Sequence, residues 1–285
     1  VSLPAGSAQD EAGNDNTVSN TLSIEADLTA PSVALSSTAT EPVSGAFPLT
    51  VTFSEDVTGF ELSDLTVGNG VASGLSGSGA VYTATITPSG DGAVTVDVAS
   101  DVATDAAGNG NTAATQFSLT NDGTAPGVSI ATSVNEPASG SFPITVTFTE
   151  DVTGFELGDL TVGNGTASEL AGSGAVYTAT ITPAGDGAVT VDIAADVAED
   201  AAGNGNTAAT QFSIESDGSA PGVTLATTAS EPVSGAFEVS LTFTETVTGL
   251  ELSDLSVTNG TASNLAGSGA SYTVSITPSS DGDVS

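Results

Sequence analysis

Residues 49–53 read Leu-Thr-Val-Thr-Phe, so that apolar and hydroxyl side chains alternate. Successive side chains of a β-strand point to opposite faces, and strict alternation is typical of a strand with one buried face. The sequence therefore predicts a half-buried β-strand at this point.

Other short strands are predicted on both sides of this stretch. Clusters of Gly, Asn, Asp, Pro and Ser separate them, and no segment has the period of a helix. The apolar residues that mark these strands are Val33 and Leu35, Leu65 and Val67, Tyr82, Ala84 and Ile86, Val94, Val96 and Val98, and Phe117 and Leu119. About seven short strands within residues 31–122 predict an all-β fold of tandem immunoglobulin-like antiparallel β-sandwiches.

The whole pattern returns at a step of 95 residues. The residues that keep this step include Pro31, Pro126 and Pro221; Phe53, Phe148 and Phe243; and Tyr82, Tyr177 and Tyr272. We therefore expect complete modules at residues 28–122 and 123–217, joined by short linkers that contain proline. Residues 218–285 are expected to be the N-terminal part of a further module, and residues 1–27 the C-terminal part.

The two ends of the chain fit together as one module. If Ser285 is joined to Val1, Asp10 takes the same place in its repeat as Asp105 and Asp200. We therefore expect the 285 residues to be one period of a longer polypeptide. The alternative is a separate subunit whose N-terminal strand completes the open third module of a neighbour. Either way, the expected partners are neighbouring copies placed end to end.

The composition excludes several functions. The chain has 35 acidic residues and no Lys, Arg or His, so it offers no surface for nucleic acid or for anionic membranes. Without a cationic side chain, each carboxylate must be solvated, hydrogen-bonded or bound to a metal. No apolar run approaches the roughly 18 residues of a membrane span. The absence of His, Cys and Lys removes the usual nucleophiles and bases, so we do not expect an enzyme.

Four motifs recur in each module. They are Glu-Pro-x-Ser-Gly-x-Phe at 41–47, Thr-Phe-x-Glu-x-Val-Thr-Gly at 52–59, Asp-Leu-x-Val-x-Asn-Gly at 64–70 and Asp-x-Ala-Gly-Asn at 105–109. This pattern resembles the bacterial Ig-like repeats of giant surface adhesins and biofilm proteins. The resemblance implies an acidic, extracellular stalk or surface filament, often loaded with calcium near the domain junctions.

The residues themselves also favour calcium. Ca²⁺ binds six to eight oxygen ligands, and this chain offers many carboxylates and amides without competing nitrogen or sulfur ligands. Strand order places the Asp105 turn, the loop of Glu55 and Asp56, and linker residue Asp27 at one end of a module. The predicted ligands are Asp10, Asn14, Asp27, Glu41, Glu55, Asp56, Asp91, Asp105, Asn109, Asp122, Glu136, Glu150, Asp151, Asp186, Asp200, Asn204, Asp217, Glu231, Glu245 and Asp281.

Two simpler interpretations remain open. The Asp-x-Ala-Gly-Asn segment can be a turn whose Asp and Asn bond their own backbone, and scattered acids can merely keep the surface soluble. One predicted ligand is not constant, since Asp56 and Asp151 are replaced by Thr246 in the third module. The function expected from the sequence is a calcium-rigidified stalk in adhesion, biofilm or surface extension, with a ligand-binding adhesin module as a further alternative.

Overall fold

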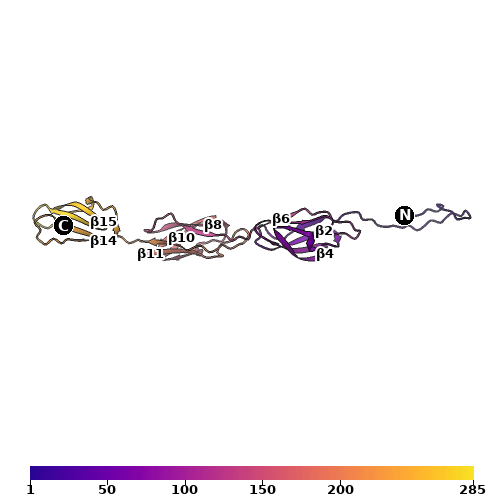
Figure 1. The fold of residues 1–285 in the computed structure, drawn as a ribbon, viewed down its shortest axis with the longest axis horizontal. Helices are drawn as coiled ribbons and strands as arrows, with labels where there is room; N and C mark the ends of the chain where they lie inside the picture. The colour runs from indigo at the N-terminus through magenta and orange to yellow at the C-terminus, as the bar shows by residue number, and fades with distance from the viewer.

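A computed structural model describes residues 1–285. Two β-sandwich modules and a third module with a single sheet follow one another in a row, and the two termini lie at opposite ends of an elongated molecule (Figure 1). The structure contains no α-helix that could serve as a membrane span.

The first two modules have the same two-sheet architecture. In the first module, the elements are β1 (Val33–Ser36), β2 (Phe47–Val57), η1 (Leu62–Asp64), β3 (Leu65–Gly68), β4 (Gly70–Pro88), β5 (Gly92–Val98) and β6 (Phe117–Asn121). The second contains β7 (Val128–Ala131), β8 (Phe142–Val152), η2 (Leu157–Asp159), β9 (Leu160–Gly163), β10 (Gly165–Pro183), β11 (Gly187–Ile193) and β12 (Phe212–Ser216). Sheet β1-β2-β4 faces sheet β3-β5-β6, and β7-β8-β10 faces β9-β11-β12, with antiparallel pairing throughout. The predicted all-β, Ig-like sandwich class is confirmed.

The residues of β4 form a β-hairpin, although they are assigned to one continuous strand. Its first half lies against its second half, where Ser73 Oγ donates to Thr85 O at 3.5 Å. The chain reverses at Gly77 and Gly79, whose φ angles of 124° and 67° suit glycine. A side chain at Gly77 would collide with the backbone of Val81, so the turn requires its absence. Counting the two halves of β4 separately brings each module to the expected number of strands.

Alternation along β2 builds the core. Leu49, Val51 and Phe53 are buried, and the intervening threonines face outward or are partly exposed. Leu49 pairs with Ala84 and Val51 with Tyr82 across the β2–β4 ladder. Each complete module buries sixteen hydrophobic residues between its sheets, and together they form one closed core per module.

The third module has one sheet only. It consists of β13 (Val223–Ala226), β14 (Phe237–Val247), η3 (Leu252–Asp254) and β15 (Gly260–Pro278), with sheet order β13-β14-β15. Only four hydrophobic residues are fully buried there. The inner face of this sheet therefore remains open.

The N-terminal residues 1–27 contain no strand and contact no sandwich through a sheet. They fold back on themselves, with Leu22 N donating to Val1 O at 2.8 Å and Asn16 N donating to Ala8 O at 2.9 Å. Residues 1–3 and 282–285, which the repeat assigns to one strand, lie at opposite ends of the molecule (Figure 1).

A buried asparagine anchors the loop between β5 and β6. Asn111 is 1% exposed, and its Oδ1 accepts from Val102 N at 3.0 Å and Ala103 N at 2.8 Å. Its Nδ2 donates to Ala99 O and Thr112 O. Asn206 repeats this arrangement in the second module.

We predict that Asn206→Ala lowers the stability of the second module by about 3 kcal/mol, because several buried backbone groups lose their partner. Differential scanning calorimetry would show one module melting at a lower temperature. Asn16→Ala is the matched control, since Asn16 makes equivalent bonds in the exposed N-terminal segment. Equal effects of the two substitutions on the sandwich transitions would contradict the prediction.

Candidate metal sites at the module junctions

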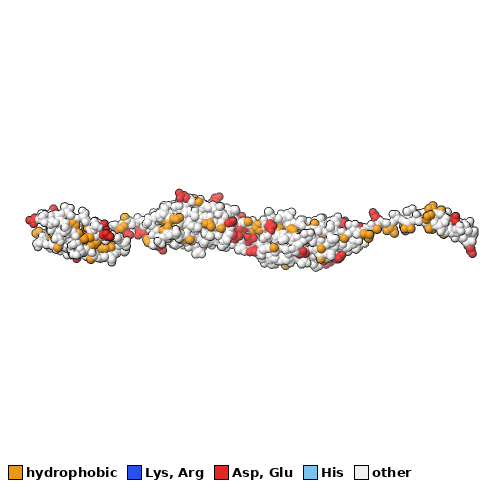
Figure 2. Space-filling model, turned by 90° about the horizontal axis from the view of Figure 1, so that it is seen from above, with side chains coloured by type: hydrophobic (Ala, Val, Ile, Leu, Met, Phe, Trp, Pro, Cys, Tyr) orange, Lys and Arg blue, Asp and Glu red, His pale blue; other side chains and the backbone are white.

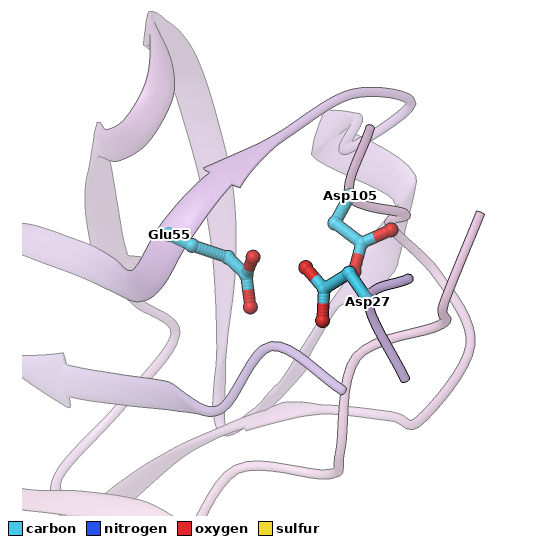
Figure 3. Close-up of side chains that lie close together, drawn as sticks. All are labelled: Asp27, Glu55 and Asp105. Carbon is cyan, nitrogen blue, oxygen red and sulfur yellow. The ribbon is translucent and has the colours of Figure 1, made fainter. Parts of the chain in front are cut away.

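Three carboxylates converge at the N-terminal end of the first module. Glu55 projects from β2, Asp105 from the turn between β5 and β6, and Asp27 from the preceding linker (Figure 3). Ligand oxygens of the three groups lie within 4.8 Å of one another. Asp122, Glu150 and Asp200 form the equivalent cluster at the start of the second module, within the same distance. Figure 2 shows acidic side chains gathered at this junction.

The Asp105 turn is stabilised by its own side chain. Asp105 Oδ1 accepts from Ala107 N and Asn109 N, both at 2.8 Å, and Oδ2 accepts from Asn109 Nδ2 at 2.8 Å. Gly108 adopts a φ of 92°, which closes the turn. The bonds from Asn109 and the backbone hold the pKa of the Asp105 carboxyl below its ordinary value. Asp105 is therefore an ionised carboxylate. The Asp-x-Ala-Gly-Asn segment also forms the turn that the simpler interpretation predicted.

The asparagine of this turn holds the linker. Asn109 Nδ2 donates to Asp27 O at 3.2 Å, and Asn204 Nδ2 donates to Asp122 O at 2.9 Å. The amide nitrogen, rather than the oxygen, faces these groups. In this arrangement Asn109 and Asn204 hold the linker acid beside the other two carboxylates.

Burial and the close approach of the three carboxylates raise the pKa of the glutamate in each cluster. Partial burial, together with the negative charges of Asp27 and Asp105, raises the pKa of the Glu55 carboxyl. Burial and the charges of Asp122, Asp200 and Asp91 raise the pKa of Glu150 in the same way. Like charges at this separation repel one another, and the chain contains no cationic side chain that could offset the repulsion.

The upstream module also contributes to each junction. Asp91 Oδ1 accepts from Gly123 N at 2.7 Å, and its Oδ2 accepts from the Thr124 hydroxyl. Asp186 binds Gly218 N at 2.8 Å and the Ser219 hydroxyl. The role of these linker hydroxyls was not predicted from the sequence, although a hydroxyl residue follows Asp-Gly at both positions. These aspartates clamp the linker from the upstream side.

Several predicted ligands lie outside the clusters. Glu41 Oε1 accepts from Thr120 N at 2.8 Å, and Glu136 Oε1 accepts from Glu215 N at 2.7 Å, so both hold the last strand of their module. The bonds from the Thr120 hydroxyl and amide lower the pKa of Glu41.

Asp56 and Asp151 lie beside the β4 and β10 hairpin turns, next to Gly79 and Gly174. They follow Glu55 and Glu150 directly on a strand, and successive side chains point to opposite faces. The replacement of this aspartate by Thr246 therefore does not remove a carboxylate from the acidic cluster of the third junction.

The remaining predicted ligands belong to an incomplete junction. Asp217 and Glu245 lie together at the third module, where burial and then the charge of Asp217 raise the pKa of Glu245. Their expected third partner, Asp10, lies with Asn14 in the N-terminal segment, where Asn14 Nδ2 donates to Asp10 Oδ2 at 2.9 Å. Glu231 and Asp281 line a separate, mostly polar pocket of the third module.

The repeated sandwich and its junctions match a known family. Residues 27–120, 122–215 and 217–285 match the bacterial Ig-like domain family. The chain belongs to this family. The predicted resemblance to bacterial Ig-like repeats is therefore confirmed, and it holds for three tandem bacterial Ig-like domains.

Three solved structures are similar to these bacterial Ig-like domains. The first is an invasin described as a bacterial integrin-binding protein, with 14% identity, a TM-score of 0.36, and coverage of 90% of this chain and 56% of that one. The second is a tetra-tandem repeat in the extending region of a large adhesion protein, with 20% identity, a TM-score of 0.30, and coverage of 87% and 66%. The third comprises domains 1–6 of surface layer protein SbsC, with 13% identity, a TM-score of 0.25, and coverage of 90% and 52%. The chain thus spans between about half and two thirds of these structures, and no curated protein matches it.

We predict that Glu150→Gln stabilises the second module in metal-free buffer near neutral pH. Because the pKa of Glu150 is raised above 4.5, the folded module holds this proton more tightly than the unfolded chain does. Its free energy of unfolding therefore falls as pH rises through the raised pKa, and the substitution removes that fall. We expect a rise of roughly 1 to 3 °C in the melting temperature, because solvent screens much of the repulsion.

Glu215→Gln is the matched control for this prediction, since Glu215 is an exposed acid of the same module outside the cluster. Thermal melts with chelator at several pH values would measure both variants. The same stabilisation in both, or a lower melting temperature for Glu150→Gln, would contradict the repulsion at the junction.

Proposed function

We propose that the chain is a stalk segment of a bacterial surface protein, which extends an adhesive or biofilm-forming region away from the cell. The linker between the first two modules carries this proposal. Asp91 binds it from the upstream module, and Asn204 binds it from the downstream module. A linker that is hydrogen-bonded to both modules restricts their relative orientation, which a flexible tether would not do.

The arrangement of the molecule supports this role. The modules follow one another in a line, without folding back (Figure 1). We propose that residues 28–122 and 123–217 each act as one independent mechanical unit, and that residues 218–285 are the start of a further unit. The bacterial Ig-like family supports an extracellular location, and no nucleic-acid partner is proposed because the chain lacks basic residues.

We further propose that each complete junction binds one structural Ca²⁺. The donor set fits a hard cation, because all three converging groups are carboxylates and the chain contains no His or Cys. Glu55 and Asp105 would hold the ion from the module, and Asp27 from the linker. Backbone oxygens and water complete the coordination shell in such sites.

The bound cation would stiffen the chain by neutralising negative charge at the junction. It would offset the repulsion that raises the pKa of Glu55 and Glu150. It would also join the linker acid to the module by ionic contacts in addition to the hydrogen bond from Asn109 or Asn204. Both effects favour one fixed orientation of neighbouring modules.

We predict that calcium raises the melting temperature and stiffens the chain. Calorimetric titration should count about two sites per monomer, one for each complete cluster. Small-angle scattering should show a longer, narrower particle with calcium than with chelator. Identical melting temperatures and identical scattering in both conditions would overturn the calcium proposal.

Paired variants locate the ions. Glu55→Gln with Glu150→Gln should abolish calcium binding, because each junction loses a converging carboxylate. Asp56→Asn with Asp151→Asn is the matched control, since these neighbours on the same strands lie outside the clusters. Loss of calcium binding in the control pair would place the ions elsewhere.

A further inference from the structure

Each junction asparagine is followed by a glycine that the fold requires. A side chain at Gly110 would collide with Asp101 Oδ1, and a side chain at Gly205 would collide with Asp196 Oδ1. Neither glycine belongs to a strand, and the backbone N–H of each donates no hydrogen bond. The backbone nitrogen that follows each junction asparagine is therefore unhindered by a side chain and free of a hydrogen-bond acceptor.

The structure requires the asparagines as well. Asn109 Nδ2 donates to Asp105 Oδ2 at 2.8 Å and to Asp27 O at 3.2 Å. Asn204 makes the same two bonds in the second module. The chain has no Lys, Arg or His, so a side-chain amide is the donor that can bond a carboxylate and a carbonyl at once. The packing and the hydrogen bonds of the junction thus place asparagine directly before glycine.

An asparagine that precedes glycine can lose its side-chain amide without a catalyst. The backbone nitrogen of the glycine attacks Cγ of the asparagine, and a new C–N bond forms. The proton of the glycine nitrogen passes to the side-chain nitrogen, which leaves as ammonia, and a cyclic succinimide remains. Water then opens either carbonyl of the ring and gives aspartate or isoaspartate. Glycine favours the first step, because it lacks a side chain and its backbone is the least restricted.

We propose that Asn109 and Asn204 are modification sites, at which spontaneous deamidation replaces the amide that holds the linker by a carboxylate. This goes beyond the stalk function and does not depend on calcium. At each junction the reaction removes two donated hydrogen bonds and adds a negative charge to the three carboxylates gathered there (Figure 3). A modified junction loses the downstream contact to its linker, so the neighbouring modules move more freely.

The product does not fit the place of the amide. In the first module the new carboxylate faces Asp105 Oδ2 and the carbonyl oxygen of Asp27, and an ionised carboxylate has no proton to donate to either. Like charges at this separation repel one another. Isoaspartate also adds a carbon to the backbone of a turn that Gly108 closes with a φ of 92°. Both products therefore open the turn.

The folded junction slows the reaction. The nitrogen that leaves Asn109 is the atom bonded to Asp105 and to the linker carbonyl, so these bonds break before it departs. The bond from Asn109 N to Asp105 Oδ1 at 2.8 Å holds the turn in addition. Deamidation therefore proceeds from the locally opened junction, and its rate follows the population of that open state.

Three further Asn-Gly pairs lie outside the junction turns. Asn69, Asn164 and Asn259 have φ angles of 54°, 53° and 55° and directly precede β4, β10 and β15. Their Nδ2 atoms donate to backbone carbonyls in the loop that follows the same strand. None of them bonds a linker residue, so these pairs serve as references within the same chain.

Peptide mapping by mass spectrometry tests the proposal on the full chain. The protein is incubated in alkaline buffer with chelator and digested with a protease that cleaves after acidic residues, since the chain offers no site for trypsin. We expect the mass gain of amide hydrolysis at Asn109 and Asn204 in the folded chain, and a faster gain in urea. No reaction at either residue after the unfolded chain has reacted completely, or equal rates with and without urea, would overturn the proposal.

A variant of one junction separates the effect of the fold from that of the Asn-Gly sequence. Asp200→Ala removes the acceptors that hold Asn204 and leaves Asn109 unchanged, so the first junction is the control within the same molecule. The rate at Asn204 should rise about tenfold relative to Asn109, which corresponds to about 1.4 kcal/mol less free energy of opening. Asp200→Asn keeps one acceptor oxygen and should give a smaller rise. An unchanged ratio of the two rates in both variants would overturn control by the junction.

The main product is reproduced by Asn204→Asp. Small-angle scattering with chelator should show a more flexible particle for this variant than for the parent, because the linker has lost its downstream contact. Asn164→Asp is the matched control, since it adds the same charge to the same module at a residue that bonds no linker group. Scattering identical to that of the parent, or the same change in both variants, would overturn the release of the linker.

Discussion

Each module depends on the contact between the inner faces of its two sheets. Period-two strands such as residues 49–53 place an apolar side chain on one face at every second residue, and a single sheet cannot remove that face from water. Sixteen hydrophobic residues are buried where both sheets are present, and four where one is present. The difference between the modules therefore follows from the missing sheet, since the residues that line the open face are of the same kind.

Electrostatics impose a second constraint on the same framework. With no cation in the sequence, every carboxylate needs water, a hydrogen-bond donor or a metal ion. The molecule uses donors at most of the conserved positions of its repeat: Asp105 in its turn, Asp91 on the linker and Glu41 on the last strand. The glutamates of the junctions lack such donors, and burial together with the neighbouring carboxylates raises their pKa values.

The junctions link these two constraints to function. A carboxylate of the upstream module and an amide of the downstream module bind the linker between them. In the proposed stalk, these hydrogen bonds would limit the motion of the linker, and calcium would limit it further.

The sequence by itself determined the strand pattern, the step of 95 residues and the sandwich class. Burial of every second residue of a strand is directly visible in the sequence as an alternation of apolar and polar residues. It also identified the Asp105 turn, Glu55 and linker residue Asp27 as members of one site. Only the tertiary structure separated Glu55 from its neighbour Asp56, since the direction of a side chain depends on which face of β2 packs inward. It also showed that Glu41 bonds the last strand and that Asn109 holds the linker through its amide nitrogen. Such partners are distant along the chain, and only the folding of the sheets decides which groups lie close enough to bond.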